Sequence, residues 1–308
     1  MQSYPAARTL RSHLLPVITT GLVLCVNARS ENRYLQHNLV SDIPGIADFL
    51  DPDLKNPWGI AASPTSPLWL SNNHSGTAKI YDTSGKPATL VVNLRAPGST
   101  AASSPTGQVF NNTPGFVLPG GKAAAFLFAT EDGTISGWYN GIENNEAAIV
   151  VNHSGSHAIY KGLAIAPPDT RGPVLLAADF HGGSVEVYDA QFAPVTLEGM
   201  FKDPDLPSGY APFNVYVAAK RVYVAYAKQD GDAEDDEPGD GNGYISVFDL
   251  EGRFQQRLIS RGKLNAPWGM VIAPPTFGDF GGRLLVGNFG DGTINAYDPG
   301  SGGFQGTL

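Results

Sequence analysis

The sequence predicts an all-β fold, a β-propeller of six blades, and three observations lead to this prediction. The 308 residues include 37 glycines and 24 prolines, a share that requires many short elements joined by turns. Apolar residues make up 42% of the chain and aromatic residues 10%, enough to bury a sizeable core. One pattern of apolar strands recurs about every 50 residues. A coiled coil is excluded, because such chains are rich in Ala, Glu, Lys and Leu.

Residues 1–28 have the pattern of a secretory signal peptide. Arg8 and Arg11 precede an apolar run over 14–26, and the small Ala28 offers a cleavage site. The alternative is an uncleaved membrane anchor, although the run is short for a bilayer span. Cys25, the only cysteine, lies inside this segment. We therefore expect a secreted, periplasmic or extracellular protein whose mature chain, 29–308, has no membrane span and no disulfide.

Each repeat begins with an inner strand near a Gly or Asn. These residues are spaced by 48, 55, 52 and 55 positions: Gly59, Gly107, Gly162, Asn214 and Gly269. A second strand follows after a turn, over 68–73, 124–132, 174–180, 221–228 and 283–289. Four short antiparallel strands in a repeat of this length are the pattern of propeller blades.

A third strand ends in an aromatic residue in every repeat. The five aromatic residues are Tyr81, Trp138, Tyr188, Phe248 and Tyr297. We expect them to pack between blades, because large aromatic side chains dominate burial between sheets. An Asp follows four of them and is expected to cap the next turn. Outer fourth strands are predicted over 89–94, 147–151, 195–201, 254–259 and 304–308.

Residues 29–308 are expected to form a single propeller domain. The predicted blades cover approximately 56–97, 105–153, 160–202, 211–260 and 265–308. Residues 34–41 resemble one more strand, and propellers often close by pairing a terminal strand with the blade at the other end. The prediction is therefore six blades, the last of them truncated at residue 308. A ring of five blades is the alternative.

Five motifs stand out together in this chain. They are Asn-Leu-Val-Ser-Asp (38–42), Asn-Pro-Trp-Gly-Ile (56–60), Trp-Leu-Ser-Asn-Asn (69–73), Ala-Thr-Glu-Asp-Gly-Thr-Ile-Ser-Gly-Trp (129–138) and Ala-Pro-Trp-Gly (266–269). In combination they resemble a family of exported NHL-like propellers, and the resemblance covers nearly all of 34–308. Some members of that family accompany exosortase/PEP-CTERM sorting systems in bacteria. The resemblance implies the propeller architecture and an export context, and it implies no particular reaction.

The strand order within a blade places two sets of loops on one face. Loops that lead into the inner strands and loops between the second and third strands meet there, because successive strands are antiparallel. Binding residues concentrate on loops held by a rigid scaffold, so we expect the binding site on this face. Its candidate residues are Asn56, Trp58, Asn72, Asn73, Glu131, Asp132, Asp179, His181, Asp230, Trp268, Asn288 and Asp291.

Oxygen-bearing side chains recur at matching positions on that face, at Asn72, Glu131, Asp179 and Asn288. Calcium prefers such oxygens, so these are the candidate metal ligands and calcium is the candidate cofactor. Calcium-dependent lactonases of the SMP-30-like type take their ligands from the central tunnel. The inner-strand starts of this chain contain no carboxylate and only one Asn. A hydrolase is therefore the alternative function, supported by analogy of fold, and no catalytic residue is assigned.

Residues 230–240 contain seven acids in eleven positions. Asp235 and Gly241 stand where an EF-hand requires Gly and Glu, so that motif is excluded. The remaining interpretations are a solvated, mobile acidic loop, a weak calcium clamp or a docking loop for a basic partner. The net charge of −9 disfavours binding to nucleic acid. We expect a monomeric binding or scaffold module for a protein or glycan partner rather than an enzyme.

Overall fold

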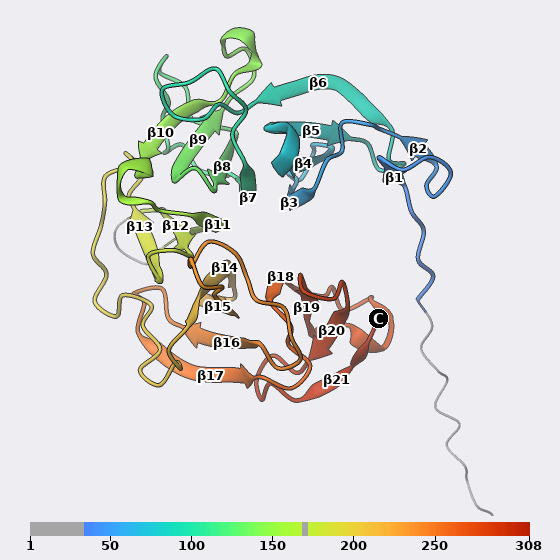
Figure 1. Ribbon diagram of the computed structural model, residues 1–308, viewed down its shortest axis with the longest axis vertical. Coiled ribbons are helices and arrows are strands. Elements are labelled where there is room, and N and C mark those ends of the chain that lie inside the picture. Colours follow the sequence, from blue (N-terminus) through green and yellow to red (C-terminus); the bar gives the residue numbers. More distant parts are fainter. Residues whose placement is uncertain (1–33, 168–171) are drawn as a thin grey trace, which may run out of the picture. The chain divides into compact units, whose positions relative to one another are not determined.

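The computed structural model describes residues 34–167 and 172–308, so the predicted signal peptide lies outside the described residues. Within these ranges the chain consists of β-strands, turns and short 3₁₀ helices (Figure 1). No helix among the described residues is long and apolar enough to cross a membrane. The predicted all-β propeller is confirmed.

Five sheets are arranged as blades around a central axis (Figure 1). Blade 1 consists of β3 (Pro57–Ala61), β4 (Leu68–Asn72), β5 (Thr77–Tyr81) and β6 (Pro87–Asn93). Blade 2 consists of β7 (Pro105–Phe110), β8 (Phe126–Thr130), β9 (Thr134–Trp138) and β10 (Ala148–Asn152). Blade 3 consists of β11 (Tyr160–Ala166), β12 (Val174–Asp179) and β13 (Ser184–Tyr188). Blade 4 consists of β14 (Tyr210–Ala218), β15 (Arg221–Lys228), β16 (Gly243–Phe248) and β17 (Phe254–Ser260). Blade 5 consists of β18 (Pro267–Ile272), β19 (Leu284–Asn288), β20 (Ile294–Tyr297) and β21 (Phe304–Thr307).

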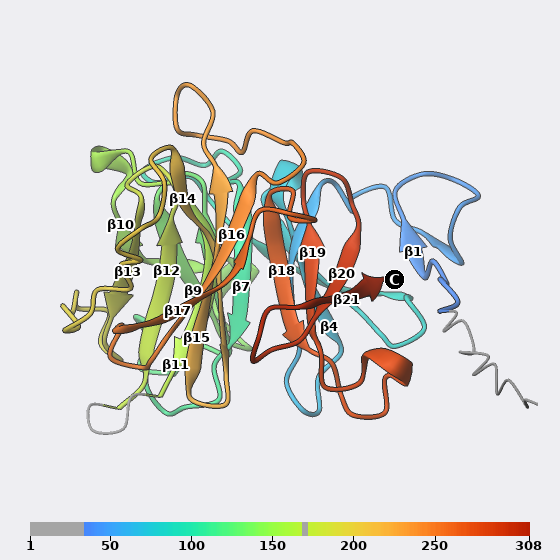
Figure 2. The same ribbon diagram turned by 90° about the horizontal axis from the view of Figure 1, so that it is seen from below.

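Neighbouring strands of a blade are antiparallel, and the strand order in the sheet follows the chain from the axis outward. The strands run along the axis, and the loops gather at its two ends (Figure 2). We call the end at which the inner strands begin the upper face and the other end the lower face. Single 3₁₀ turns lie in upper loops at η1 (Asn73–Ser75) and η3 (Ser154–Ser156) and in lower loops at η2 (Glu143–Asn145) and η4 (Gly278–Phe280).

The prediction of six blades is wrong, because the described residues form five. The sequence interpretation counted 34–41 toward an additional blade. Only β1 (Val40–Ser41) is a strand there, and it pairs in parallel with β2 (Phe49–Leu50). Gly45, with a φ of 82°, lies in the connection between these two strands. This two-stranded sheet is separate from the blades, so the alternative of five blades describes the ring.

Side chains, rather than a paired strand, connect residues 34–51 to both ends of the ring. The Tyr34 ring stacks on Phe277 and Phe280 of blade 5, with centroid distances of 4.9 and 5.5 Å. Seventeen positions further on, Asp51 accepts hydrogen bonds from the buried Lys79 at 2.7 Å and from the Tyr81 hydroxyl at 2.8 Å in blade 1. The segment therefore links the last blade to the first.

Blade 3 lacks the outer strand that was predicted over 195–201. Met200 and Phe201 both have a φ of 51°, a left-handed conformation that an extended strand does not contain. Pro194 removes one backbone donor at the start of the segment. The segment is held beside β13 by the Val195 N–H, which donates to the Val187 carbonyl at 2.8 Å. Blade 3 is consequently a sheet of three strands.

The main apolar clusters lie between consecutive blades. The predicted packing of the recurring aromatic residues between blades is confirmed for four of the five, because they belong to these clusters: Trp138, Tyr188, Phe248 and Tyr297. Tyr81 is also buried, but its hydroxyl donates to Asp51, which precedes blade 1. The predicted turn caps are confirmed as well. In blade 3, for example, Asp189 Oδ1 accepts the N–H groups of Gln191 at 2.8 Å and Ala193 at 2.9 Å.

Glycines allow the inner strands of neighbouring blades to approach each other. A Cβ atom on Gly107 would lie 2.7 Å from the Leu163 backbone nitrogen, and one on Gly162 would lie 2.6 Å from the Asn214 Cα. Gly269, the corresponding residue of blade 5, is different. Its Cβ atom would meet only Gly287 of the same blade, at 4.0 Å. The inner strand of blade 5 therefore has open space where the other inner strands have a neighbour.

Candidate functional site

The upper face joins several predicted site residues in one hydrogen-bonded series. Asn56 Nδ2 donates to Asn73 Oδ1 at 3.3 Å, and Asn73 Nδ2 donates to Glu131 Oε2 at 2.9 Å. The other oxygen of Glu131 accepts a bond from Lys161 Nζ at 2.5 Å. Blade 1 contributes the two asparagines, blade 2 the glutamate and blade 3 the lysine. The series thus crosses three blades and fixes their loops relative to one another.

Lys161 is a residue of this site that the sequence analysis did not select. It lies in β11, exposes 1% of its surface and forms a second ion pair with Asp235 Oδ1 at 2.9 Å. Its ammonium lies 5.3 Å from the ring centroid of Trp58 and 5.9 Å from that of Phe180. A buried ammonium requires such partners, because its desolvation is otherwise uncompensated. The sequence signal for this residue is that Lys161 is the charged residue of β11, a strand that is otherwise uncharged.

The two predicted tryptophans lie together where blade 5 meets blade 1. The Trp58 ring is 5.7 Å from that of Trp268, 4.5 Å from Phe289 and 6.0 Å from Phe213. The Trp268 indole N–H donates to the Lys161 carbonyl oxygen at 3.0 Å. These rings close the upper end of the central space. Contacts with other side chains of the protein bury part of their surface.

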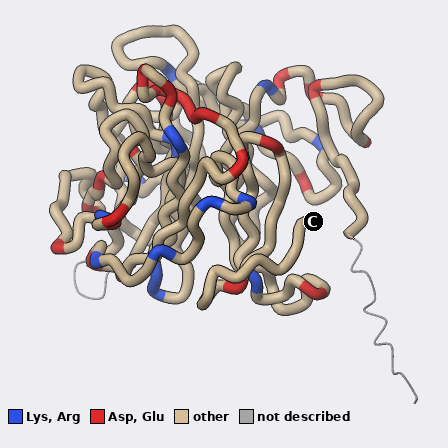
Figure 3. The backbone as a smooth tube through the Cα atoms, turned by 60° about the horizontal axis from the view of Figure 1, so that its bottom comes forward, with Lys and Arg blue, Asp and Glu red and all other residues tan. Residues whose placement is uncertain are grey.

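The acidic loop, residues 229–240, has a defined course on the upper face. The Asp230 N–H donates to the Asp235 carbonyl at 2.9 Å, and the Glu237 N–H donates to the Lys228 carbonyl at 2.8 Å. His181 Nδ1 lies 3.3 Å from the carbonyl oxygen of residue 233. The side chains of Asp235 and Glu237 nevertheless expose 74% and 51% of their surface. The loop projects at the upper end of the ring (Figure 2), and Figure 3 marks its acidic residues in red.

Two of the candidate metal ligands bond across the turn of their own blade. Asn72 Nδ2 donates to Thr77 Oγ1 at 3.3 Å, and Asn288 Nδ2 donates to Thr293 Oγ1 at 3.0 Å. A third candidate, Glu131, bonds to a lysine ammonium. Among the described residues, no group of three or more His, Cys, Asp and Glu side chains could hold a metal ion. These bonds indicate that the recurring amides close turns.

Asp179, the fourth candidate ligand, has the same place in blade 3, as the last residue of the second strand. Its Oδ1 accepts the N–H groups of Ile159 and Gly182, both at 3.0 Å. Burial raises the pKa of this carboxyl above its usual range, although the two backbone bonds act in the opposite direction. The carboxylate therefore stands where Asn72 and Asn288 supply a neutral amide.

The three remaining predicted acids also hold loops in place on the upper face. Asp132 Oδ2 accepts the Ser104 N–H at 2.9 Å, and Asp230 Oδ1 accepts the Glu234 N–H at 3.0 Å. Asp291 Oδ1 accepts the N–H two residues further along the chain at 2.9 Å. Such bonds hold loops in place, so these residues shape the face more than they offer free reactive groups.

A polar cluster in blade 3 was not predicted. The Tyr160 and Tyr188 hydroxyls both donate to Glu186 Oε2 and lie 2.9 Å from each other, while His153 Nδ1 lies 3.2 Å from the same carboxylate oxygen. Burial, followed by the bonds to Glu186, raises the pKa of both hydroxyls. The cluster borders a hollow of about 280 Å³ that includes Met200. Its groups bond to one another, which stabilises the blade of three strands.

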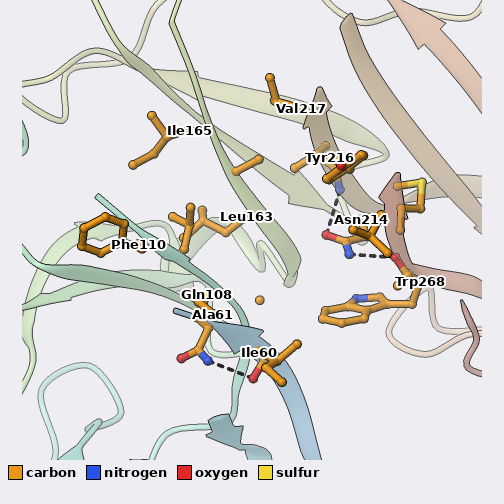
Figure 4. Close-up of a pocket in the computed structure, with 18 of the residues that line it drawn as sticks. Ile60, Ala61, Gln108, Phe110, Leu163, Ile165, Asn214, Tyr216, Val217 and Trp268 are labelled. Carbon is orange, nitrogen blue, oxygen red and sulfur yellow. Dashed lines mark hydrogen bonds between the residues drawn. The ribbon is translucent and has the colours of Figure 1, made fainter. Parts of the chain in front are cut away.

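A hollow on the axis lies below the aromatic rings. This central channel has a volume of about 620 Å³ and is lined by the inner strands of all five blades (Figure 4). Sequence reasoning placed the site on the loop-rich face and missed the channel. The signal that could have found it is the run of small and apolar residues at the axis-facing positions of the inner strands.

Two relatives in Acanthamoeba polyphaga mimivirus match most of this chain. The chain is 36% identical over 270 residues to the uncharacterized protein R648, a match that covers 84% of this chain and 66% of that protein. It is 35% identical over 272 residues to the uncharacterized protein L690, covering 84% and 70%. The chain thus spans about two thirds of the length of these relatives. No family model matches the sequence.

Solved structures of other propellers are similar in fold. Virginiamycin B lyase from Staphylococcus aureus has a TM-score of 0.51 at 12% identity, covering 82% of this chain and 69% of the lyase chain. A chain of a nidogen/laminin complex has a TM-score of 0.54 at 11% identity, covering 83% and 80%. At this level of identity the likeness concerns the fold alone.

Proposed function

This chain belongs to the family of mimivirus R648 and L690 and folds as a β-propeller, and from that premise we propose that it is a binding module for a protein partner. The partner contributes a basic segment that docks on the upper face. One observation carries the proposal: the acidic loop follows a fixed course on that face and presents its carboxylates to solvent.

The upper face is organised in advance of binding. The series from Asn56 to Lys161 connects the loops of three blades, and the Lys161–Asp235 ion pair extends it to the loop of blade 4. A surface that is already ordered loses less conformational entropy when a partner binds. This rigidity favours a recognition surface.

The charge of the face favours a basic partner. Asp232 and Glu234 are exposed at the tip of the acidic loop, next to the exposed Asp235. The whole chain carries a net charge of −9, so the loop adds to an already negative field. Complementary charge guides association and selects partners.

A protein partner is favoured over a glycan. Glycan recognition would use the flat faces of exposed aromatic rings, for which Trp58 and Trp268 are the candidates. Both rings are half-buried and contact each other, and the Trp58 ring also contacts Phe213. Burial of the two rings therefore reduces the aromatic surface on which a sugar could stack.

The test compares two double variants that remove the same charge from opposite faces. Asp232→Asn with Glu234→Gln changes the acidic loop, and Glu143→Gln with Asp279→Asn changes exposed residues of lower loops. The probe is a fluorescein-labelled octalysine peptide, measured by fluorescence anisotropy. The loop variant should weaken binding by about fivefold or more, while the lower-face variant should stay within about 1.5-fold of the unmodified protein. Equal losses in both variants, or no binding by the unmodified protein, would contradict the proposal.

A calcium-dependent hydrolase remains the alternative proposal, and one observation favours it. The side-chain oxygen of Asn72 is buried and has no hydrogen-bond partner. Calcium bound at this oxygen would raise the melting temperature by mass action on the folded state. A melting temperature that calcium leaves unchanged, with no turnover of a lactone, would remove this alternative.

Export is a further part of the proposal. It rests on the pattern of residues 1–28, and an association with exosortase/PEP-CTERM sorting systems rests on the motifs alone. The monomeric state is likewise a prediction. A reporter protein fused behind residues 1–28 would test export, because the fusion should appear outside the cell.

A further inference from the structure

The central channel is lined without a charged side chain. None of the described residues that line it is Lys, Arg, His, Asp or Glu, although 16% of the chain is charged. Apolar side chains reach it from every inner strand, among them Ile60, Phe110, Leu163, Val217 and Met270. Figure 4 shows several of these side chains around the same space. The chemistry of the lining is therefore uniform around the ring.

The polar side chains of the channel already have partners within the protein. Gln108 Nε2 donates to the Gly59 carbonyl at 2.9 Å, and Asn214 Nδ2 donates to the Trp268 carbonyl at 2.8 Å (Figure 4). Asn214 Oδ1 accepts the N–H of the next residue at 2.8 Å. These amides hold neighbouring blades together. What remains for a ligand is apolar surface and the unpaired backbone groups along the axis-facing edges of the inner strands.

The channel is closed at one end and accessible at the other. At the upper end the Trp58 and Trp268 rings are in contact, and Gly59 and Asn214 just below them are buried. Along the inner strands of blades 1 and 5, Ile60 exposes 61% and Val271 47% of its surface. These two side chains are large apolar groups in contact with water. A ligand would reach the channel from this side, away from the acidic loop.

We infer that the central channel binds a neutral, predominantly apolar small molecule. A volume of about 620 Å³ is typical of small-molecule pockets. Transfer of apolar ligand surface from water to this lining is favourable. A charged ligand would lose its hydration without meeting a partner of opposite charge. The channel is distinct from the acidic face, so this inference can be tested independently of the proposed function.

The experiment uses two dyes that share one ring system. N-phenyl-1-naphthylamine is neutral, whereas 1-anilinonaphthalene-8-sulfonate carries a negative charge. Titration into the full chain should give saturable fluorescence for the neutral dye, with one site per chain. Binding of the anionic dye should be weaker by about tenfold or more, because its sulfonate finds no partner in the channel.

Variants then locate the binding site. Val271→Lys places a charge at the exposed side of the channel and should weaken the neutral dye by about tenfold while strengthening the anionic one. Gly269→Leu adds a side chain in open space beside the channel and should also weaken the neutral dye. The control is Met200→Lys, since Met200 is 58% exposed and borders the smaller hollow of blade 3. The inference is overturned if the neutral dye does not bind, or if Met200→Lys reduces its binding as much as the channel variants do.

Discussion

The last residue of the second strand has a short polar side chain in several blades, but its charge differs from blade to blade. Asn72 and Asn288 supply a neutral amide that donates to a threonine across the turn, whereas Asp179 supplies a carboxylate that is 5% exposed. Burial raises the pKa of the Asp179 carboxyl in the folded chain. As the pH rises above the ordinary value of 3.8, the unfolded chain loses this proton first, so the free energy of unfolding falls. At neutral pH the charge of Asp179 therefore lowers stability.

The variant Asp179→Asn should be more stable than the unmodified protein at pH 7. The amide oxygen can keep both backbone N–H bonds, and the buried charge is removed. We expect the free energy of unfolding to rise by roughly 1 kcal/mol at pH 7, with the gain shrinking as the pH approaches 4. Urea denaturation at the two pH values measures this. A variant that is less stable at pH 7 would show that the carboxylate has a favourable partner.

Asp51→Asn provides a contrast of opposite sign. Burial alone would raise the pKa of the Asp51 carboxyl, but the bonds from Lys79 and Tyr81 outweigh it and lower the pKa below the ordinary value. Asp51 therefore contributes stability above the pKa of the unfolded chain, and this contribution is lost as the pH falls through the folded pKa. Its replacement should destabilise the protein at pH 7 and leave a buried lysine with a weaker partner.

At the scale of elements, the packing of inner strands depends on the absence of side chains. Gly107 and Gly162 lie against the backbone of the next blade, so a methyl group at either position would displace a strand. Gly269 has no such neighbour. Gly107, Gly162 and Gly269 occupy equivalent positions in the repeat, but only Gly269 has room for a side chain.

Gly162→Ala should destabilise the protein by about 3 kcal/mol or more, because its methyl group would overlap with Asn214. The matched variant Gly269→Ala should change the free energy of unfolding by less than about 1 kcal/mol. Chemical denaturation of both variants gives the comparison. Similar losses at both positions would mean that blades 5 and 1 pack as closely as blades 3 and 4.

At the scale of the whole molecule, the junction of blades 5 and 1 differs from the others. Tyr34 stacks on two phenylalanines of blade 5, while Trp58 of blade 1 contacts Trp268 of blade 5. Aromatic contacts of this kind contribute about 0.5–1.5 kcal/mol each beyond their burial. The junction thus depends on a few side chains.

Tyr34→Ala should therefore loosen this junction more than the rest of the ring. We expect a loss of about 1–2 kcal/mol in the free energy of unfolding and faster hydrogen exchange in β3 and β18 than in β11. Tyr34→Phe, which keeps the stacked ring, is the control and should retain most of the stability. Uniform acceleration of exchange in all blades would contradict this role of Tyr34.

The repeat itself could be predicted from the sequence because its signals are local. Each strand, the aromatic residue that ends the third strand and the Asp that follows it lie within a few positions of one another. The bonds of Asp189 to residues two and four positions further on show this directly. Local patterns of this kind do not depend on the rest of the chain.

The errors and omissions concern contacts between distant residues. The number of blades depends on where residues 34–51 go, and Tyr34 meets Phe277 from 243 positions away. Lys161 could not be recognised without knowing that Glu131 and Asp235 lie beside it, 30 and 74 positions away. The channel is formed by five strands from the whole chain. The gathering of these loops on the upper face was predicted from the strand order, but the role of Lys161 among them was not.

The absence of charged side chains from the described lining of the channel has a consequence for how the two proposed sites respond to salt. Dissolved salt screens attraction between exposed charges beyond about 8 Å at physiological ionic strength, and it leaves apolar contacts largely intact. The proposed binding of a basic partner at the acidic loop should therefore weaken as salt is added, whereas the proposed binding of an apolar ligand in the channel should not. On these two proposals, a rise in salt concentration would release the basic partner and leave the apolar ligand bound.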